Sequence, residues 1–508
     1  MEQNAGSRVR DVSSRLATLV DHPALPLLLI GGIALALLST LRSGQEWDGD
    51  FALYIMNARN IVLGLPYAQT EYLFNPANPE IHPAAYPPGL PLLFAPVYAV
   101  WGLDLVKFKV LCVIALCLFL LVFHRIARSA VRPSYALCLT ALVGLHPFVM
   151  ASENSPASEF PFMFFCYSAL WLLDRAQEQE VSRRWPAALM VMSTFAVALA
   201  YLTRSIGILL FPTASVVSLL HSRRLITPTN ASLAAALTVI VLAQLAFPAD
   251  IGTYVQSLNK ISLHGLWASV VHYAGVRNTL FGQVARAHAV AGTVLGVTLL
   301  ALAVVGFLDR ALRRISVFEV FCVAYVAFLI IYPVTAEVSR YAMPIWPLLF
   351  LYAARGVERC VERWQPAAQW AVAAGASAVL VAVYVIQYHT MSFGEIPNSV
   401  TAAQSEELFT TIEQRLPPGA RVLARKPTII GLFTGHQSSC WPETFSDDEL
   451  WSYLRARHID YVIQDLGHLG VRPTPVDPLD TFIERNRAQL RPVFRNDWFN
   501  VYVAEPLG

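Results

Sequence analysis

Long apolar runs separated by short polar connections make up most of the chain before residue 390. A helix needs about 20 apolar residues to cross the hydrocarbon core of a bilayer. Runs of roughly this length lie near residues 24–42, 108–124, 133–150, 156–173, 186–202, 206–221, 229–247, 287–308, 316–333, 341–356 and 367–388. The pattern therefore predicts a polytopic α-helical membrane protein with about eleven transmembrane helices.

The polar connections alternate in charge along the chain. Every second connection is short and rich in arginine, for example Arg125, Arg128 and Arg132, whereas those between are longer and carry few basic residues. Because basic loops stay on the cytoplasmic side, the N-terminus is expected in the cytoplasm and the C-terminus outside. We expect a multi-pass protein of the cell inner (plasma) membrane.

The outer side then carries most of the polar sequence, in a transmembrane domain of residues 1–391 with outer loops 43–107 and 248–286. In the first loop, Phe51–Leu63 is predicted as a surface helix that Gly64 ends. Leu90–Val100 is apolar but too short to span, so we expect it in the membrane interface or re-entering from it.

After residue 392 the chain becomes charged, with helix-like and strand-like stretches in alternation. Arg421–Ala424 and Ile459–Gln464 are predicted as buried strands, Asp447–Arg457 as a helix, and Trp498–Val503 as a closing strand. The pattern predicts a small extracytoplasmic α/β domain over residues 392–508, long enough to bury a core.

Composition supports the membrane assignment. Hydrophobic residues make up 56% of the 508 positions and charged residues 14%, whereas soluble domains average about 25% charged. The net charge of +2 gives no indication of a nucleic-acid partner. No phosphate-binding glycine motif, Cys-x-x-Cys pair or nucleophile elbow occurs, so no soluble cofactor is expected. A divalent cation stays possible.

Two aspartates follow shortly after the first apolar run, in Glu46-Trp47-Asp48-Gly49-Asp50. Asp50 begins the predicted surface helix, where a carboxylate can cap the first amides. Ionisable residues at a membrane face are costly and often functional, which favours catalysis at Asp50 and leaves both interpretations open for Asp48. Glu159, at the entry to the fourth run, is either favoured by the helix dipole or faces a cavity.

Few basic residues are available on the outer side to accompany these acids. Arg204 occupies a tight outer turn, and Arg340 with Tyr341 begins the tenth run. An arginine fork matches phosphate geometry, so these residues are candidate phosphate ligands, with Arg59 a third. The alternative is that such arginines reach towards lipid head groups.

These features resemble the GT-C superfamily of membrane glycosyltransferases, in the branch with protein O-mannosyltransferases and lipid A aminoarabinose transferases. The resemblance spans most of the chain. It is carried by Asp50-Phe51-Ala52-Leu53-Tyr54, by Tyr86-Pro87-Pro88-Gly89-Leu90, by Leu202-Thr203-Arg204, and by Arg340-Tyr341-Ala342-Met343-Pro344. Each motif alone is weak, and their order and outer-face placement make the set more specific.

The resemblance implies a donor in which a sugar is joined to a polyprenyl phosphate, and a catalytic base at the place of Asp50. Relatives often have an Asp-Glu pair there, whereas this chain has Phe51 in the second place. Either Asp48 takes the role of the second carboxylate, or that role is absent. The base would take a proton from an acceptor hydroxyl as it attacks the anomeric carbon, with inversion. Arg204 and Arg340 would hold the departing phosphate, with Tyr341, Arg59 and Glu159 also candidates for binding substrate. The acceptor, whether glycan, lipid or protein, is open.

Two other function classes compete with a glycosyltransferase. A membrane transporter of a lipid-linked or anionic substrate would use the same ionisable residues as a substrate path, but transporters usually show internal repeats and bind at midplane. This sequence shows neither. A non-catalytic cell-envelope assembly protein, with the tail as its binding module, is compatible with the sequence as well.

Overall fold

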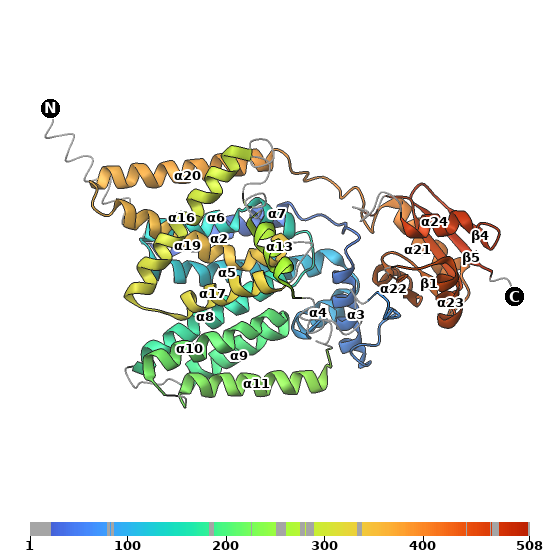
Figure 1. The fold of residues 1–508 in the computed structure, drawn as a ribbon, viewed down its shortest axis with the longest axis horizontal. Coiled ribbons are helices and arrows are strands. Elements are labelled where there is room, and N and C mark those ends of the chain that lie inside the picture. Colours follow the sequence, from blue (N-terminus) through green and yellow to red (C-terminus); the bar gives the residue numbers. More distant parts are fainter. Residues whose placement is uncertain are drawn as a thin grey trace.

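A computed structural model of the chain describes residues 22–78, 82, 86–181, 187–224, 226–249, 261–274, 280, 289–332, 338–442, 444–467, 469 and 477–505. It consists of a bundle of long helices and, at one end of the bundle, a C-terminal unit (residues 399–504) built on one β-sheet (Figure 1). Two helices of the predicted outer loop 43–107, α3 and α4, lie beside that end of the bundle.

Apart from α13, which lies in the predicted outer loop 248–286, the bundle helices follow the apolar runs of the sequence. They are α2 (Ala24–Ser39), α5 (Leu105–Ala130), α6 (Pro133–Gly144), α7 (Pro147–Ser152), α8 (Glu159–Val181), α9 (Ala187–Thr203), η1 (Ser205–Leu209), α10 (Leu210–Ser222), α11 (Pro228–Ala246), α13 (Leu263–Ala274), α16 (Ala289–Arg313), α17 (Val317–Ile331), α18 (Val338–Ala342), η2 (Met343–Ile345), α19 (Trp346–Val361) and α20 (Pro366–Tyr388). Among the described residues, five helical segments are long and apolar enough to cross a membrane, and five more helices are apolar but shorter. The number of spans therefore stays a prediction.

Prolines break two of the predicted runs. The run 133–150 forms α6 and α7, because Pro147 begins a new helix and the His146 side chain accepts a hydrogen bond from the Phe148 amide. The run 341–356 begins as the short α18 and η2, and α19 starts only at Trp346, with Pro347 in its first turn. Most of the predicted outer loop 248–286 lies outside the described residues, apart from α13.

The bundle core is close-packed, and small residues bring two of its helices together. α16 and α19 meet at Gly306 and Gly356, where a Cβ on either glycine would overlap the backbone of the opposite helix. Close approach at small residues is a typical contact between membrane helices, since it maximises packing without a hydrophobic driving force.

In the first outer loop, α3 (Gly49–Leu63) ends where predicted, at Gly64 with φ 67°. The expectation of a surface helix is wrong, however, because most residues from Phe51 to Asn60 are buried. α4 (Gly89–Trp101) packs on one side of α3, and α22 (Pro427–Thr434) of the C-terminal unit packs against it as well. The cover from α22 comes from residues almost 400 positions away in sequence.

The C-terminal unit contains one mixed sheet. Its elements are α21 (Ala403–Arg415), β1 (Val422–Leu423), α22, β2 (Ser438–Ser439), α23 (Asp447–Arg457), β3 (Tyr461–Asp465), α24 (Pro478–Arg485), β4 (Leu490–Arg495) and β5 (Phe499–Ala504). The strand order is β2-β1-β3-β5-β4, with β1 parallel to β2 and β3, and β5 antiparallel to β3 and β4. The helix predicted over Asp447–Arg457 is α23. The predicted closing strand over Trp498–Val503 is β5, the last strand of the chain, which lies between β3 and β4.

Candidate functional site

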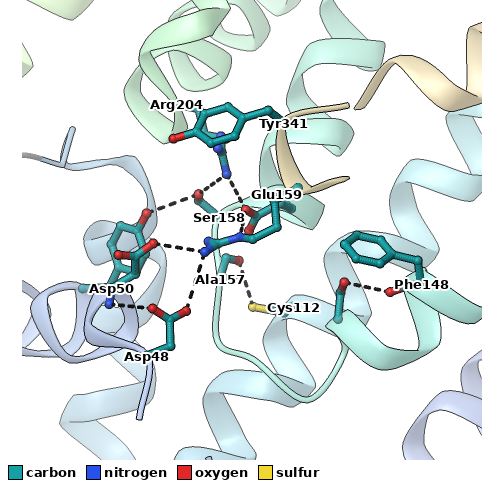
Figure 2. A network of polar contacts seen from close by, with 12 residues as sticks. Asp48, Asp50, Cys112, Phe148, Ala157, Ser158, Glu159, Arg204 and Tyr341 are labelled. Carbon is teal, nitrogen blue, oxygen red and sulfur yellow. Dashed lines mark hydrogen bonds and ion pairs between the residues drawn. The ribbon is translucent and has the colours of Figure 1, made fainter. Parts of the chain in front are cut away.

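The polar residues singled out in the sequence meet where α3, α8, α18 and the turn between α9 and η1 come together. Asp48 and Asp50 lie at the start of α3, opposite Glu159 and Arg204, with Tyr341 beyond Arg204 (Figure 2). Arg340, from α18, forms ion pairs with Asp48, Asp50 and Glu159. Five of the seven candidate residues thus belong to one charged network.

The two aspartates occupy different positions in α3. Asp48 is the N-cap residue, and its side chain accepts a hydrogen bond from the Asp50 amide at 3.5 Å. The capping role considered for Asp50 therefore falls to Asp48. Asp50 stands in the first turn, where the helix dipole favours its negative charge.

Both carboxylate oxygens of Asp50 have a donor. The Tyr86 hydroxyl donates to Oδ1 at 2.7 Å, and Nη1 of Arg340 donates to Oδ2 at 3.3 Å. The same Nη1 lies 3.6 Å from Oδ2 of Asp48. The Asp50 side chain is still 31% exposed, so it is held in place without being sealed off.

Glu159 links the two arginines. Its Oε1 accepts from Nη1 of Arg204 at 2.6 Å and from Nε of Arg340 at 2.8 Å. α8 begins at Glu159, three residues later than the predicted start at Pro156, because the Ser158 carbonyl accepts the first helical hydrogen bond, from Phe162. Glu159 is therefore at the helix N-terminus, where the dipole favours it, and it also has the cationic partners that burial demands.

Arg204 is the residue just before η1, and its backbone is extended. Besides Glu159, its Nη1 contacts Ser158 Oγ at 3.1 Å, and its guanidinium lies 5.4 Å from the centre of the Tyr341 ring. Burial works to lower the pKa of Arg204, but Glu159, Tyr341 and Tyr54 together outweigh burial and raise that pKa. Arg204 therefore stays a cation. Among the described residues, only its Nη1 donates hydrogen bonds, which leaves Nε and Nη2 for a ligand.

The sequence assigned no role to three residues of the site, Tyr54, Tyr86 and Ser158. Tyr54 and Tyr86 form an aromatic pair, with ring centroids 4.4 Å apart, and the Tyr54 hydroxyl donates to Ser158 Oγ at 3.3 Å. Burial first, and the Asp50 carboxylate second, raise the pKa of Tyr54, so its hydroxyl keeps its proton. Tyr86 precedes the Pro-Pro-Gly motif of the outer loop, and that position was the available signal.

Arg59 belongs to another contact. It donates to both carboxylate oxygens of Glu71, at 2.7 and 2.9 Å, and none of its hydrogen bonds within the described residues reaches the Asp50 network. The network itself holds three carboxylates and two guanidiniums. No group of three His, Cys, Asp or Glu side chains in the described part of the chain is arranged to hold a metal ion.

The arrangement combines two chemical capacities. A partly exposed carboxylate, fixed by two donors, can accept a proton from a nearby hydroxyl. In the same network Arg204, whose Nε and Nη2 donate no hydrogen bond within the described residues, can bind an anion such as a phosphate.

Comparison with known proteins identifies the fold. No family model matches the sequence, and no curated protein is significantly similar to it. Solved structures do match. The oligosaccharyltransferase AglB from Archaeoglobus fulgidus, in complex with an inhibitory peptide and a dolichol-phosphate, has a TM-score of 0.56 at 13% identity, over 87% of this chain and 69% of that one.

ArnT from Cupriavidus metallidurans, bound to undecaprenyl phosphate, matches over almost the full length of both chains. The TM-score is 0.56 at 14% identity, over 95% of this chain and 98% of ArnT; for ArnT in the apo state it is 0.54. At this identity the likeness concerns the fold. The chain is a multi-pass helical membrane protein with the fold of the GT-C membrane glycosyltransferases.

Proposed function

We propose that this protein transfers a sugar from a polyprenyl-phosphate donor to an acceptor hydroxyl at the outer face of the membrane. The observation that supports the proposal is the placement of Asp50 and Arg340 in one network with Glu159 and Arg204. A proton acceptor and an anion-binding group lie side by side in a fold whose solved examples include structures with dolichol-phosphate and undecaprenyl phosphate.

In this reaction Asp50 is the base. The acceptor oxygen attacks the anomeric carbon of the donor, its proton passes to the Asp50 carboxylate, and the bond from that carbon to the phosphate oxygen breaks. The electron pair of the broken bond leaves with polyprenyl phosphate, so a single displacement inverts the anomeric centre. Tyr86 and Arg340 occupy one acceptor position on each Asp50 oxygen, and a carboxylate oxygen has a second lone pair to receive the proton.

Arg204 and Arg340 bind the phosphate and stabilise the charge that develops as it leaves. In the structure both guanidiniums form ion pairs with Glu159, and Arg340 also pairs with Asp48 and Asp50. Both cations therefore already have carboxylate partners when the phosphate binds. The phosphate binds through Nε and Nη2 of Arg204, while Glu159 holds Nη1 in position. Tyr341 supports the guanidinium of Arg204 from one face.

Two features support a site at the outer face of the membrane. A lipid-linked sugar reaches a bilayer-level site without a cytoplasmic nucleotide sugar, and the basic connections of the sequence put the Asp50 side outside. The acceptor is a glycan, lipid or protein hydroxyl of the cell envelope. Arg59 has no part in phosphate binding in this proposal, because its guanidinium forms an ion pair with Glu71.

Binding of polyprenyl phosphate to the purified protein in nanodiscs tests the phosphate clamp. Arg204→Lys and Arg340→Lys should each weaken binding roughly tenfold, because lysine keeps the charge and loses the paired donors. The alanine variants should lose more. Arg491→Lys, at an exposed arginine of the C-terminal unit, is the matched control and should bind like wild type.

The competing interpretations give different results. If the arginines only reach towards lipid head groups, lysine will be as good as arginine at both positions. Unchanged affinity in both alanine variants would remove the clamp and favour the transporter. Normal binding without any sugar transfer in the presence of cell-envelope acceptors would favour a non-catalytic assembly protein.

A further inference from the structure

The residues that lead into α3 are bound by the C-terminal unit along their whole length. The Gln45 amide donates to Ser399 Oγ at 3.0 Å, and the Gln45 carbonyl accepts from the Val400 amide at 2.8 Å. Glu46 forms an antiparallel bridge with Ser399. At Gly44 any Cβ would overlap the Ser399 side chain, so this approach requires a residue without a side chain.

Trp47 inserts its ring into the C-terminal unit. It is 4% exposed, and its ring centre lies 5.5 Å from that of Phe409 in α21 and 5.4 Å from that of Phe499 in β5. Its Nε1 donates to Ser405 Oγ at 3.3 Å. A large aromatic side chain just before Asp48 is thus part of the packing of a unit that begins about 350 residues later.

A third contact fixes the first residue of α3. The Thr428 hydroxyl, on α22, donates to the Gly49 carbonyl at 3.2 Å, and Thr428 is fully buried. The other end of α3 is attached as well: Arg59 pairs with Glu71, whose backbone carbonyl accepts from the Ser438 amide of β2 at 2.9 Å. The helix that carries Asp50 is therefore held at both ends by contacts with the C-terminal unit.

The bundle holds the same segment from the opposite side. Lys109, a fully buried residue of α5, donates from its Nζ to the carbonyls of Arg42 and Gly44. The Arg42 amide donates to Asn154 Oδ1 at 2.7 Å. Residues 42–49 are thus bonded both to the bundle and to the C-terminal unit, and they lead directly into Asp50.

We infer that the C-terminal unit is a positioning element for Asp50, which it holds against Arg340 through residues 44–49. None of its described residues belongs to the charged network, so it acts on the reaction only through the place it gives to α3. A displacement of about 1 Å at a reacting group can cost on the order of 100-fold in rate. The part of this inference that concerns rate rests on the proposed glycosyl transfer.

Thr428 allows a test with small changes in a full-length protein. Thr428→Val keeps the shape and removes the hydroxyl that binds Gly49, and Thr428→Ser restores a hydroxyl there. Thr434→Val is the matched control, because that hydroxyl bonds to the Ile430 carbonyl within α22 itself. Two quantities are measured in nanodiscs: hydrogen exchange of the amides of residues 48–56, and the kcat and KM for the donor lipid.

We expect faster exchange over residues 48–56 in Thr428→Val, together with a fall in kcat on the order of tenfold at unchanged KM. Thr428→Ser should recover both, and Thr434→Val should match wild type. Exchange like wild type in Thr428→Val would overturn the inference, as would faster exchange with unchanged kcat. If Thr428→Val does not fold, Ser405→Ala, which removes the partner of Trp47, is judged by the same two measurements.

The test separates this inference from the proposed function. If the wild-type protein transfers no sugar, the proposed function fails, and the exchange comparison still decides whether the C-terminal unit holds the start of α3. A purely stabilising unit would lower the melting temperature of Thr428→Val without a selective change over residues 48–56, and that result would contradict positioning.

Discussion

At the start of α3, Asp48 and Asp50 are only two residues apart but have different roles, one structural and one chemical. Asp48 caps the helix through the Asp50 amide, which fixes where the first turn begins. Asp50 then projects from that turn towards Tyr86 and Arg340. Because a cap residue and a first-turn residue point in different directions, one can orient the helix while the other faces a substrate.

At the residue scale, Tyr86 tests this division. Tyr86→Phe removes the donor to Asp50 Oδ1 and keeps the ring that packs on Tyr54. A hydrogen bond to a charged group contributes about 1.5–3 kcal/mol, so we expect kcat to fall roughly tenfold or more with KM for the donor little changed. Steady-state kinetics measure both quantities.

The matched control for this variant is Tyr388→Phe, which removes a hydroxyl hydrogen bond to the Leu145 carbonyl away from the site. It should leave kcat unchanged. Equal effects of the two substitutions would mean that Tyr86 contributes only general stability.

Among the elements, the junction of α4 with α9 sets the place of Arg204. Gly89, the first residue of α4, lies so close to the end of α9 that a Cβ there would stand 2.6 Å from the Leu202 carbonyl and 2.7 Å from the Thr203 nitrogen. Arg204 follows directly, and its amide still bonds back to the Ala200 carbonyl. α4 therefore supports the turn that presents the guanidinium.

Gly89→Ala should accordingly disturb phosphate binding. Rigid backbone atoms cannot move aside as a flexible side chain does, so the end of α9 must shift. We expect weaker polyprenyl-phosphate binding and a lower melting temperature. Gly375→Ala in α20, where nothing lies within 4 Å of the new Cβ, should change neither; a Gly89→Ala protein that binds and melts like wild type would refute the close contact.

Sequence patterns predicted the positions of the long helices and of α23, but not the burial of α3. The long helices follow from hydropathy, because each must cover a bilayer by itself, and α23 follows from local signals such as the Ser446–Glu449 capping box. The burial of α3 could not be predicted, since its cover, α22, is almost 400 residues away. Asp50, Glu159, Arg204 and Arg340 were selected because ionisable residues are rare at a membrane face. The roles of Tyr86 and Ser158 depend on distances that no local pattern contains.

For the whole molecule, the account requires that the C-terminal unit and the Asp50 network lie on the same, outer side. The C-terminal unit bonds to Trp47 and Gly49, the two residues that flank Asp48, so one topology measurement covers both. The inner side is assigned only by its basic connections.

Cysteine labelling tests that topology. In a variant without the native cysteines, a reagent that cannot cross membranes should modify Gln414→Cys, an exposed position of α21, in intact cells. Ile226→Cys, which is 95% exposed and lies in a predicted inner connection, should react only after the membrane is opened. The reverse pattern would invert the orientation and place the site in the cytoplasm.

The central claim, sugar transfer with Asp50 as base, is tested most directly by mass spectrometry of the surface glycans and glycolipids of a deletion strain of the source organism. We predict that one sugar-bearing species disappears, that the wild-type gene restores it, and that Asp50→Asn does not, because loss of a general base costs roughly 10²–10⁴-fold in rate. Asp48→Asn, which keeps a side-chain acceptor for the Asp50 amide, should restore it at least in part. The same species at wild-type abundance in the Asp50→Asn strain would contradict the account.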